Sequence, residues 1–314
     1  MKTRRVIYSL AVLIILPLLF SSCRGTVGVV EPGMEIEAAR EESARRLWEE
    51  GQSRQARGEY RRALRAYREL VGEYPGSTPA PEAQFRIGVC LEKLDRLYRA
   101  FQAYQTLLED YPGQGELGEI LRRQYEIGEA YLEGRKRWFL FLRIRSVLSR
   151  AEEIFRTVVN NATFSPVAPR AQYGLARSLE LRGRNLEAIL EYEQVLVNYP
   201  GSEVFPSALF GLGACHYREA RRADYDQREV DESLRHLRRF VNSFPDHPRR
   251  SGAEEMIGNL RDRRAKKAYD IARYYQRRGS VTGARLYYRE VVDNYPDSKY
   301  AESARKKLEK LDEE

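Results

Sequence analysis

The chain has 314 residues, of which 54 are Lys or Arg and 46 are Asp or Glu, giving a formal net charge of +8. Three of the bases and none of the acids precede Cys23, a cleavage site described below, so the mature chain would carry 51 bases against 46 acids, or +5. Because both signs alternate along the chain, the charges indicate solvated helix faces and exclude a nucleic-acid-binding footprint.

The first 22 residues have the pattern of an export signal. A basic start is followed by an apolar run from Val6 to Phe20, which is short for a membrane span. The sequence Phe20-Ser21-Ser22-Cys23 resembles a bacterial lipoprotein processing site, so we expect Cys23 to carry lipid on its sulfur and its amine. The alternatives are a secretory signal with a chance cysteine and a single N-terminal membrane anchor. Because no aspartate follows Cys23, an outer-membrane position facing the periplasm is favoured.

Residues 23–36 form the next predicted segment. The stretch up to Pro32 is rich in glycine and valine and lacks helical periodicity, which indicates a coil that tethers the chain to its anchor. Helical periodicity is expected from about Glu37, so residues 37–314 are the predicted helical region.

The helical region repeats one frame: an alanine, an aromatic residue four positions later and a proline eight positions after that. Alanine allows close helix approach, the aromatic fills the space between helix pairs, and proline ends the helix. Units of 37 residues or more are typical of stacked helix pairs that present long binding surfaces to other proteins. Four copies are complete and two are partial: Ala63/Tyr67/Pro75, Ala100/Tyr104/Pro112, Ala188/Tyr192/Pro200 and Ala284/Tyr288/Pro296, then Ala151/Phe155/Thr163 and Ser233/Leu237/Pro245.

Small residues mark two further positions of each unit. Matching first-helix positions hold Gly51, Gly88, Gly128, Ala176, Gly213 and Ala272. Between the helices, a left-handed residue can close a short turn at Gly58, Gly183 and Gly279. The pattern resembles the tetratricopeptide repeat from about Ser43 to Leu311. It predicts an all-α, right-handed solenoid of about six helix-turn-helix units with a C-terminal capping helix.

Two insertions interrupt the frame. In repeat three, 11 extra residues fall at about 135–146 and begin with Arg135, Lys136, Arg137, Trp138 and Phe139. This basic, aromatic segment could contact lipid headgroups or a partner, or it could be a long loop whose aromatics fold over the neighbouring repeat. In repeat five, a polar insertion at about 220–230 predicts an exposed loop.

No catalytic group, cofactor motif or metal site is predicted. The three histidines, His216, His236 and His247, do not form the two-histidine helical pair of zinc proteases, and no cysteine pair has zinc-ligand spacing. Cys90 and Cys215 occupy equivalent positions in repeats two and five, too far apart for a disulfide, so we expect small buried hydrophobes. The sequence therefore indicates a binding protein rather than an enzyme.

The C-terminal third resembles the BamD family of outer-membrane assembly lipoproteins. The similarity lies in the run from Arg261 to Gly279, which contains Tyr274-Tyr275, and in the run that reaches Tyr295-Pro296. The family resembles a five-repeat stack, whereas this chain has six predicted units and a basic insertion.

This resemblance implies a scaffold of the machinery that inserts β-barrels into the outer membrane. The N-terminal repeats would engage the C-terminal signal of unfolded outer-membrane protein precursors, and the C-terminal repeats would bind the periplasmic domains of the central barrel subunit. Candidates for a groove lined by first-helix side chains are Trp48, Phe85, Arg122 and Tyr125, although these residues could instead be core.

Two rival functions remain open at the level of sequence. A repeat adaptor of another envelope system, such as Tol–Pal, a pilus or a secretion machine, would share the repeats and the anchor but bind a different partner. An enzyme accessory that grips the cell wall through its arginines is a third class.

Overall fold

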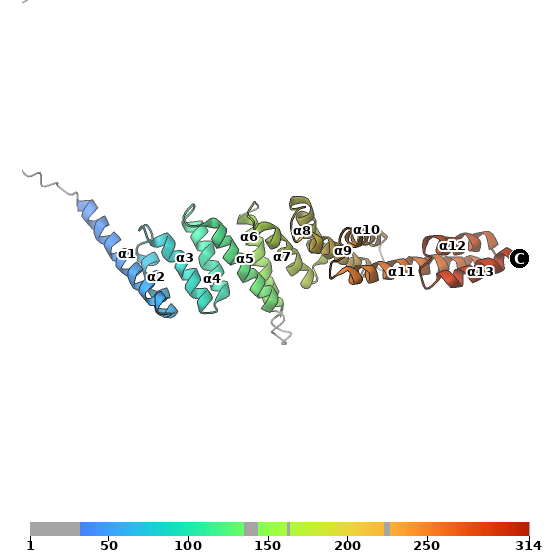
Figure 1. Cartoon of the computed structure of the whole chain (residues 1–314), viewed down its shortest axis with the longest axis horizontal. Coiled ribbons are helices and arrows are strands. Elements are labelled where there is room, and N and C mark those ends of the chain that lie inside the picture. Colours follow the sequence, from blue (N-terminus) through green and yellow to red (C-terminus); the bar gives the residue numbers. More distant parts are fainter. Residues whose placement is uncertain (1–31, 135–143, 162–163, 223–226, 314) are drawn as a thin grey trace, which may run out of the picture.

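The computed structural model describes residues 32–134, 144–161, 164–222 and 227–313. These ranges contain thirteen α-helices and no strand, stacked one after another along a single long axis (Figure 1). None of the helices in these ranges combines the length and apolar character needed to cross a bilayer. The bounds are α1 (Pro32–Ala56), α2 (Tyr60–Glu73), α3 (Ala80–Lys93), α4 (Leu97–Asp110), α5 (Leu117–Gly134), α6 (Ile144–Asn161), α7 (Ala168–Leu181), α8 (Asn185–Asn198), α9 (Phe205–Arg222), α10 (Gln227–Ser243), α11 (Arg250–Arg277), α12 (Val281–Asn294) and α13 (Ala301–Glu313).

Consecutive helices pack as pairs, from α1 with α2 to α11 with α12, and α13 packs on α12. The predicted all-α solenoid of six units with a final helix is confirmed. The first helix begins at Pro32, a few residues before the predicted start near Glu37. Most of the predicted insertion at 135–146 lies outside the described residues, as do residues 223–226 of the insertion at 220–230.

The repeated frame forms the contact between the two helices of each pair. Tyr67, Tyr104, Tyr192 and Tyr288 are fully buried. A Cβ atom added to Gly88 would lie 2.3 Å from Cε1 of Tyr104, far inside the distance that two carbon atoms can approach. Glycine is therefore required at this position because the tyrosine ring of the second helix occupies the space of a side chain.

The predicted left-handed turns are confirmed at three positions. Gly58, Gly183 and Gly279 have φ of 75°, 76° and 76° between the helices of their pairs. In the second pair, Asp95 takes the left-handed conformation instead, with φ of 55°.

A second regularity is a hydrogen bond between the two helices of a pair. Each frame tyrosine donates its hydroxyl to a side chain twelve residues earlier, on the first helix: Tyr67 to Gln55, Tyr104 to Glu92, Tyr192 to Glu180 and Tyr288 to Gln276. In the two remaining pairs the second helix carries Phe155 or Leu237. The acceptor position, four residues after the small residue of the first helix, is then Leu132 or Tyr217, which lies 23 or 20 residues earlier because of the insertions. Acceptor and hydroxyl are thus both present in four pairs, while neither Phe155 nor Leu237 has a hydroxyl to donate.

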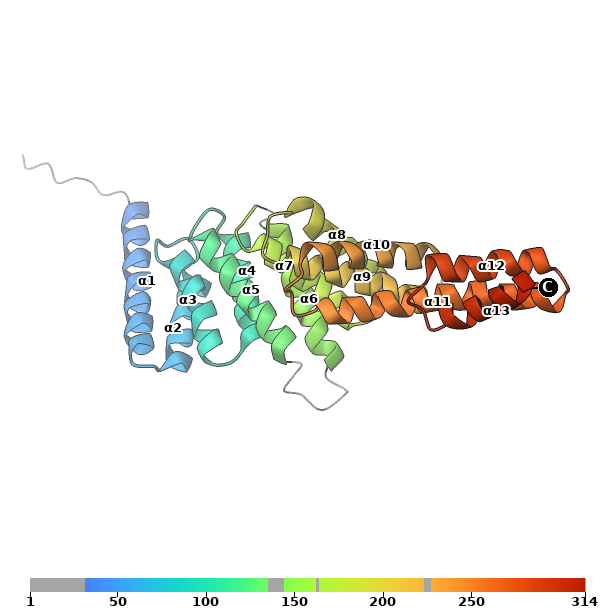
Figure 2. The ribbon, with the colours of Figure 1, turned by 45° about the vertical axis from the view of Figure 1, so that its right-hand side comes forward.

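The long helix α11 belongs to two parts of the stack. Ala253 in its first half packs against Leu237 and Phe240 of α10, while Ala265 and Ala272 in its second half pack against α12. Figure 2 shows α11 reaching from beside α10 to the end formed by α12 and α13. This helix therefore closes the fifth unit and opens the sixth without a break.

The cysteines of repeats two and five are buried and free, as the sequence predicts. Burial raises the pKa of Cys90 to about 11 and that of Cys215 to about 12, so both thiols stay protonated near neutral pH. They act as small hydrophobic side chains.

Candidate partner-binding surfaces

One aromatic side chain on the first helix of each pair lies three positions before the small residue. Each is half-buried, with its ring centroid 5.4–5.9 Å from that of an aromatic on the second helix. One side of each ring therefore contributes to the core while part of it remains accessible. The members of this aromatic row are Trp48, Phe85, Tyr125, Tyr173, Phe210 and Tyr269.

Trp48, Phe85 and Tyr125 are predicted groove residues, whereas the last three members of the row are not among the predicted ones. Tyr173, Phe210 and Tyr269 have the same spacing from Ala176, Gly213 and Ala272, so this spacing is the signal that identifies them.

Arginines from the next repeat lie beside members of the row. The guanidinium carbon of Arg123, on α5, is 5.4 Å from the ring centroid of Phe85, on α3. Arg123 also pairs with Glu92 at 3.0 Å and with Glu119 at 2.7 Å. Because both the cation and the ring remain partly exposed, this pair offers an aromatic face and a positive charge to one ligand.

Arg122, the arginine that the sequence predicts in this groove, points in a different direction from Arg123. Its guanidinium is exposed and pairs with Glu119 and Glu126 of its own helix. One residue corresponds to about 100° of rotation around a helix, so Arg123, and not Arg122, reaches Phe85.

A buried charged network lies next to the row between α7, α8 and α9. Glu180, whose side chain is 4% exposed, pairs with Arg177 at 2.6 Å and with Arg218 at 2.8 Å. It also accepts the hydroxyl of Tyr192 at 2.5 Å. Burial acts to raise the pKa of Glu180, but the arginines and the tyrosine outweigh burial and hold this pKa below its usual value. Two arginines are thereby fixed at the junction of repeats four and five.

A second candidate surface is a cleft of about 930 Å³ between α10, α11 and α12. Tyr275 and Tyr287 stack in its wall, with ring centroids 5.7 Å apart and planes 8° apart. Tyr274 is 48% exposed beside them. Its charged lining residues are four bases and one acid: Arg263, Arg264, Lys266, Lys267 and Asp270. Lys266 pairs with Asp270 and Arg264 with Asp231, which leaves an excess of positive charge in the lining. A cleft with tyrosines and several cations suits an acidic protein surface.

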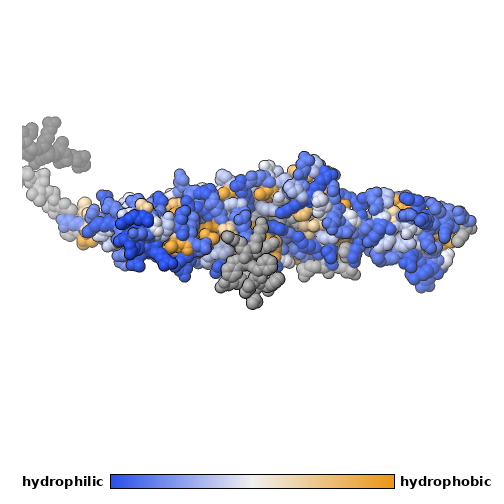
Figure 3. Space-filling view, turned by 60° about the horizontal axis from the view of Figure 1, so that its bottom comes forward, coloured by the Kyte–Doolittle hydropathy of each residue, from blue (hydrophilic) through white to orange (hydrophobic). Residues whose placement is uncertain are grey.

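Other predicted contact residues lie outside the described ranges. These are Cys23 and the run Arg135, Lys136, Arg137, Trp138 and Phe139. On the face drawn in Figure 3, hydrophobic residues form small separate patches within a mostly hydrophilic surface. The roles of Cys23 and of residues 135–139 in lipid or partner contact remain predictions.

The helix pairs and their repeated frame define a tetratricopeptide repeat protein, and residues 44–115 match that repeat family. Residues 143–314, more than half of the chain, match the YfiO family of outer membrane lipoproteins. The chain belongs to this family.

One relative is the outer membrane protein assembly factor BamD of Caulobacter vibrioides, which is 21% identical over 156 residues. The alignment covers 50% of this chain and 51% of the relative, so the chain matches about half the length of that protein.

Similar solved structures include two tetratricopeptide repeat proteins. The protein from Parabacteroides merdae is 13% identical, with a TM-score of 0.37 over 86% of this chain and 98% of its own. The protein from Thermus thermophilus is 17% identical, with a TM-score of 0.36 over 68% and 98%. The PilF protein of Pseudomonas aeruginosa is 14% identical, with a TM-score of 0.33 over 86% and 99%.

Proposed function

We propose that this protein is a scaffold of the β-barrel assembly machinery, anchored to the outer membrane by lipid on Cys23 and facing the periplasm. It binds unfolded outer-membrane protein precursors and the periplasmic domains of the central barrel subunit. The observation that carries this proposal is the family match over residues 143–314, a range that contains the cleft between α10, α11 and α12. The protein acts by holding its partners together.

The aromatic row is the proposed binding site for precursors. An extended signal strand with aromatic side chains can stack on the accessible parts of Trp48, Phe85 and Tyr125, because offset aromatic contacts are favourable beyond their buried area. Arg123 beside Phe85 supplies a cation for the carboxylate that ends such a strand. Arg122 on the same helix is paired with Glu119 and Glu126, so it adds little further positive charge.

The cleft between α10, α11 and α12 is the proposed binding site for the barrel subunit. Its cations favour an acidic partner surface, and Tyr274 and Tyr275 can be buried against that surface. Two separate sites on one stack would hold a precursor and the barrel subunit at the same time. The rigid repeats between them would fix the distance between the two partners.

Peptide binding to the purified protein tests the first site. We expect a fluorescent peptide with the C-terminal sequence of an outer-membrane barrel to bind, and Phe85→Ala, Tyr125→Ala and Arg123→Ala each to weaken binding about tenfold or more. Phe164→Ala is the matched control, since this ring is fully exposed and lies outside the row. A C-terminally amidated peptide should lose the contribution of Arg123 only. Unchanged affinity in stably folded Phe85→Ala and Tyr125→Ala would exclude the row as the site.

A further inference from the structure

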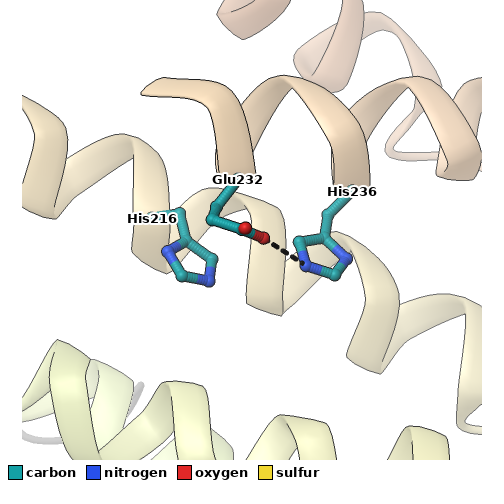
Figure 4. A group of neighbouring side chains, drawn as sticks. All are labelled: His216, Glu232 and His236. Atoms are coloured by element: carbon teal, nitrogen blue, oxygen red, sulfur yellow. Dashed lines mark ion pairs between the residues drawn. The ribbon is translucent and has the colours of Figure 1, made fainter. Parts of the chain in front are cut away.

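Two histidines and a glutamate meet where α9 packs on α10. His216 lies on α9, while Glu232 and His236 lie four residues apart on one face of α10. One potential ligand atom from each residue lies within 4.8 Å of the other two. Figure 4 shows the carboxylate of Glu232 between the two imidazole rings. The three side chains therefore converge on one small volume at the interface of the two helices.

The ring of His216 is held in a fixed orientation by a second carboxylate. Its Nδ1 lies 2.7 Å from Oε2 of Glu229, an arrangement in which Nδ1 carries the proton and donates to the carboxylate. The opposite nitrogen, Nε2, is then an acceptor with a free lone pair. This atom is buried and has no hydrogen-bond partner, and the residue as a whole is 7% exposed. Histidines that bind metals are typically oriented in this way by a carboxylate on the other nitrogen.

The ring of His236 has no satisfied nitrogen at all. Both Nδ1 and Nε2 are buried without a hydrogen bond, and Nε2 lies 3.4 Å from Oε2 of Glu232. An imidazole ring with one proton keeps a lone pair on its other nitrogen, which a ligand can use. Buried polar atoms without partners are uncommon in folded proteins and often mark the site of a bound ion or water.

We propose that His216 Nε2, His236 Nε2 and the carboxylate of Glu232 bind one divalent transition metal ion of the zinc class. Two imidazoles and one carboxylate are a ligand set that zinc uses, with water as the fourth ligand. Two nitrogen ligands disfavour Mg²⁺ and Ca²⁺, which prefer oxygen.

The geometry requires only a modest contraction of the cluster. The two rings are nearly parallel, at 6°, with centroids 5.7 Å apart. Ligand atoms of a tetrahedral zinc site are roughly 3.3 Å apart, because each bond is about 2.0–2.1 Å long. Side-chain rotations can close the difference, since Glu232 is 30% exposed and can leave its present ion pair with Arg235. The negative charges of Glu229 and Glu232 offset the nearby arginines.

The metal would clamp α9 to α10 across the polar insertion of repeat five. This pair lacks the tyrosine hydroxyl bond that joins four of the other pairs, because Leu237 occupies the tyrosine position. A metal bridge between His216 and the α10 ligands would supply an alternative polar link between the same two helices.

Metal binding by the purified full chain tests this proposal. We expect equilibrium dialysis to find one Zn²⁺ per chain, and Co²⁺ to give the visible absorption of a tetrahedral site. His216→Gln, His236→Gln and Glu232→Ala should each abolish stoichiometric binding, and Glu229→Gln should weaken it about 10–100-fold. His247→Gln is the matched control, because His247 lies outside the cluster and accepts the backbone N–H of Arg249.

The outcomes are separable from loss of fold. Circular dichroism of each variant reports helix content. Zn²⁺ should raise the thermal midpoint of the parent and of His247→Gln, should raise that of Glu229→Gln by less, and should leave the three ligand variants unchanged. If either histidine variant unfolds, zinc binding by Glu232→Ala decides the question, because Glu232 is partly exposed and its substitution should leave the fold intact. Less than a tenth of a zinc ion per chain in the parent, or stoichiometric binding that persists in Glu232→Ala, would overturn the proposal.

Discussion

The hydroxyl of Tyr192 donates a 2.5 Å hydrogen bond to Oε2 of Glu180, twelve residues earlier and on the other helix of the same pair. Tyr288 makes the equivalent bond to the neutral amide oxygen of Gln276 at 2.9 Å. The same tertiary contact thus has a charged acceptor at Glu180 and a neutral one at Gln276.

Removing these hydroxyls should destabilise the two pairs by different amounts. Tyr192→Phe is expected to cost about 1.5–3 kcal/mol, the range for hydrogen bonds to charged groups, and Tyr288→Phe about 0.5–1.5 kcal/mol. Urea denaturation followed by circular dichroism measures both. Equal costs would show that the charge on Glu180 adds nothing to the bond.

The same bond can be built into repeat three, where Phe155 and Leu132 replace the donor and the acceptor. Phe155→Tyr alone should destabilise the protein, because its hydroxyl would meet Leu132 without a partner. Adding Leu132→Gln should recover about 1 kcal/mol. If the double variant loses as much stability as the two single variants lose together, the pairing of these two positions is contradicted.

Acid should weaken the network around Glu180. Its pKa is lower in the folded protein than its ordinary value of 4.5, so the ionised carboxylate stabilises the fold above about pH 4.5. That stabilisation is lost as the pH falls through the folded pKa. The stability difference between the parent and Glu180→Gln should therefore be largest near pH 7 and should shrink toward pH 3. Glu193→Gln, an exposed change on α8, should show no comparable trend.

The close approach at Gly88 gives a matched pair of glycine substitutions. Gly88→Ala should lower stability by about 1–3 kcal/mol, because the new Cβ would overlap the buried ring of Tyr104. Gly72→Ala, on the exposed face of α2 with nothing within 4 Å, should raise stability by about 0.5–1 kcal/mol. Thermal or urea midpoints of the two variants check this. If both variants change stability by the same amount, the side chain of Tyr104 can move away from the new Cβ at no cost.

Much of the fold follows from local sequence chemistry. The frame that contains Tyr104 and Pro112 predicts the pairs, because burial of the ring and the helix-breaking proline act within a single unit. The turn glycines are predictable for the same reason, since the φ of Gly58 depends only on its own turn.

The sites depend on how one helix is placed against another, which the repeated frame does not specify. Arg123 rather than Arg122 lies over Phe85 because of the rotation of α5 on α3. His216 meets Glu232 and His236 only because of the register of α9 on α10, and the insertion at 220–230 separates the two helices in the sequence. The four-residue spacing of Glu232 and His236 is a weak signal that becomes informative once the third ligand is located.

Lipid attachment at Cys23 can be tested separately from binding. Cells given labelled palmitate should incorporate label into the native chain and not into Cys23→Ala. The variant should also leave the membrane fraction, since several acyl chains are needed for stable anchoring. Because Cys90 and Cys215 are buried with raised pKa values, Cys90→Ala should keep the label. Label that persists in Cys23→Ala would place the anchor elsewhere.

Capture of the protein from detergent-solubilised membranes tests the scaffold role most directly. The identity and the amount of each co-purifying protein are measured for the parent, for Lys267→Glu in the cleft and for Lys307→Glu on the exposed side of α13. We predict that the central barrel subunit is recovered with the parent and with Lys307→Glu, and is strongly reduced with Lys267→Glu. Recovery of Tol–Pal, pilus or secretion components without the barrel subunit would contradict the proposed function.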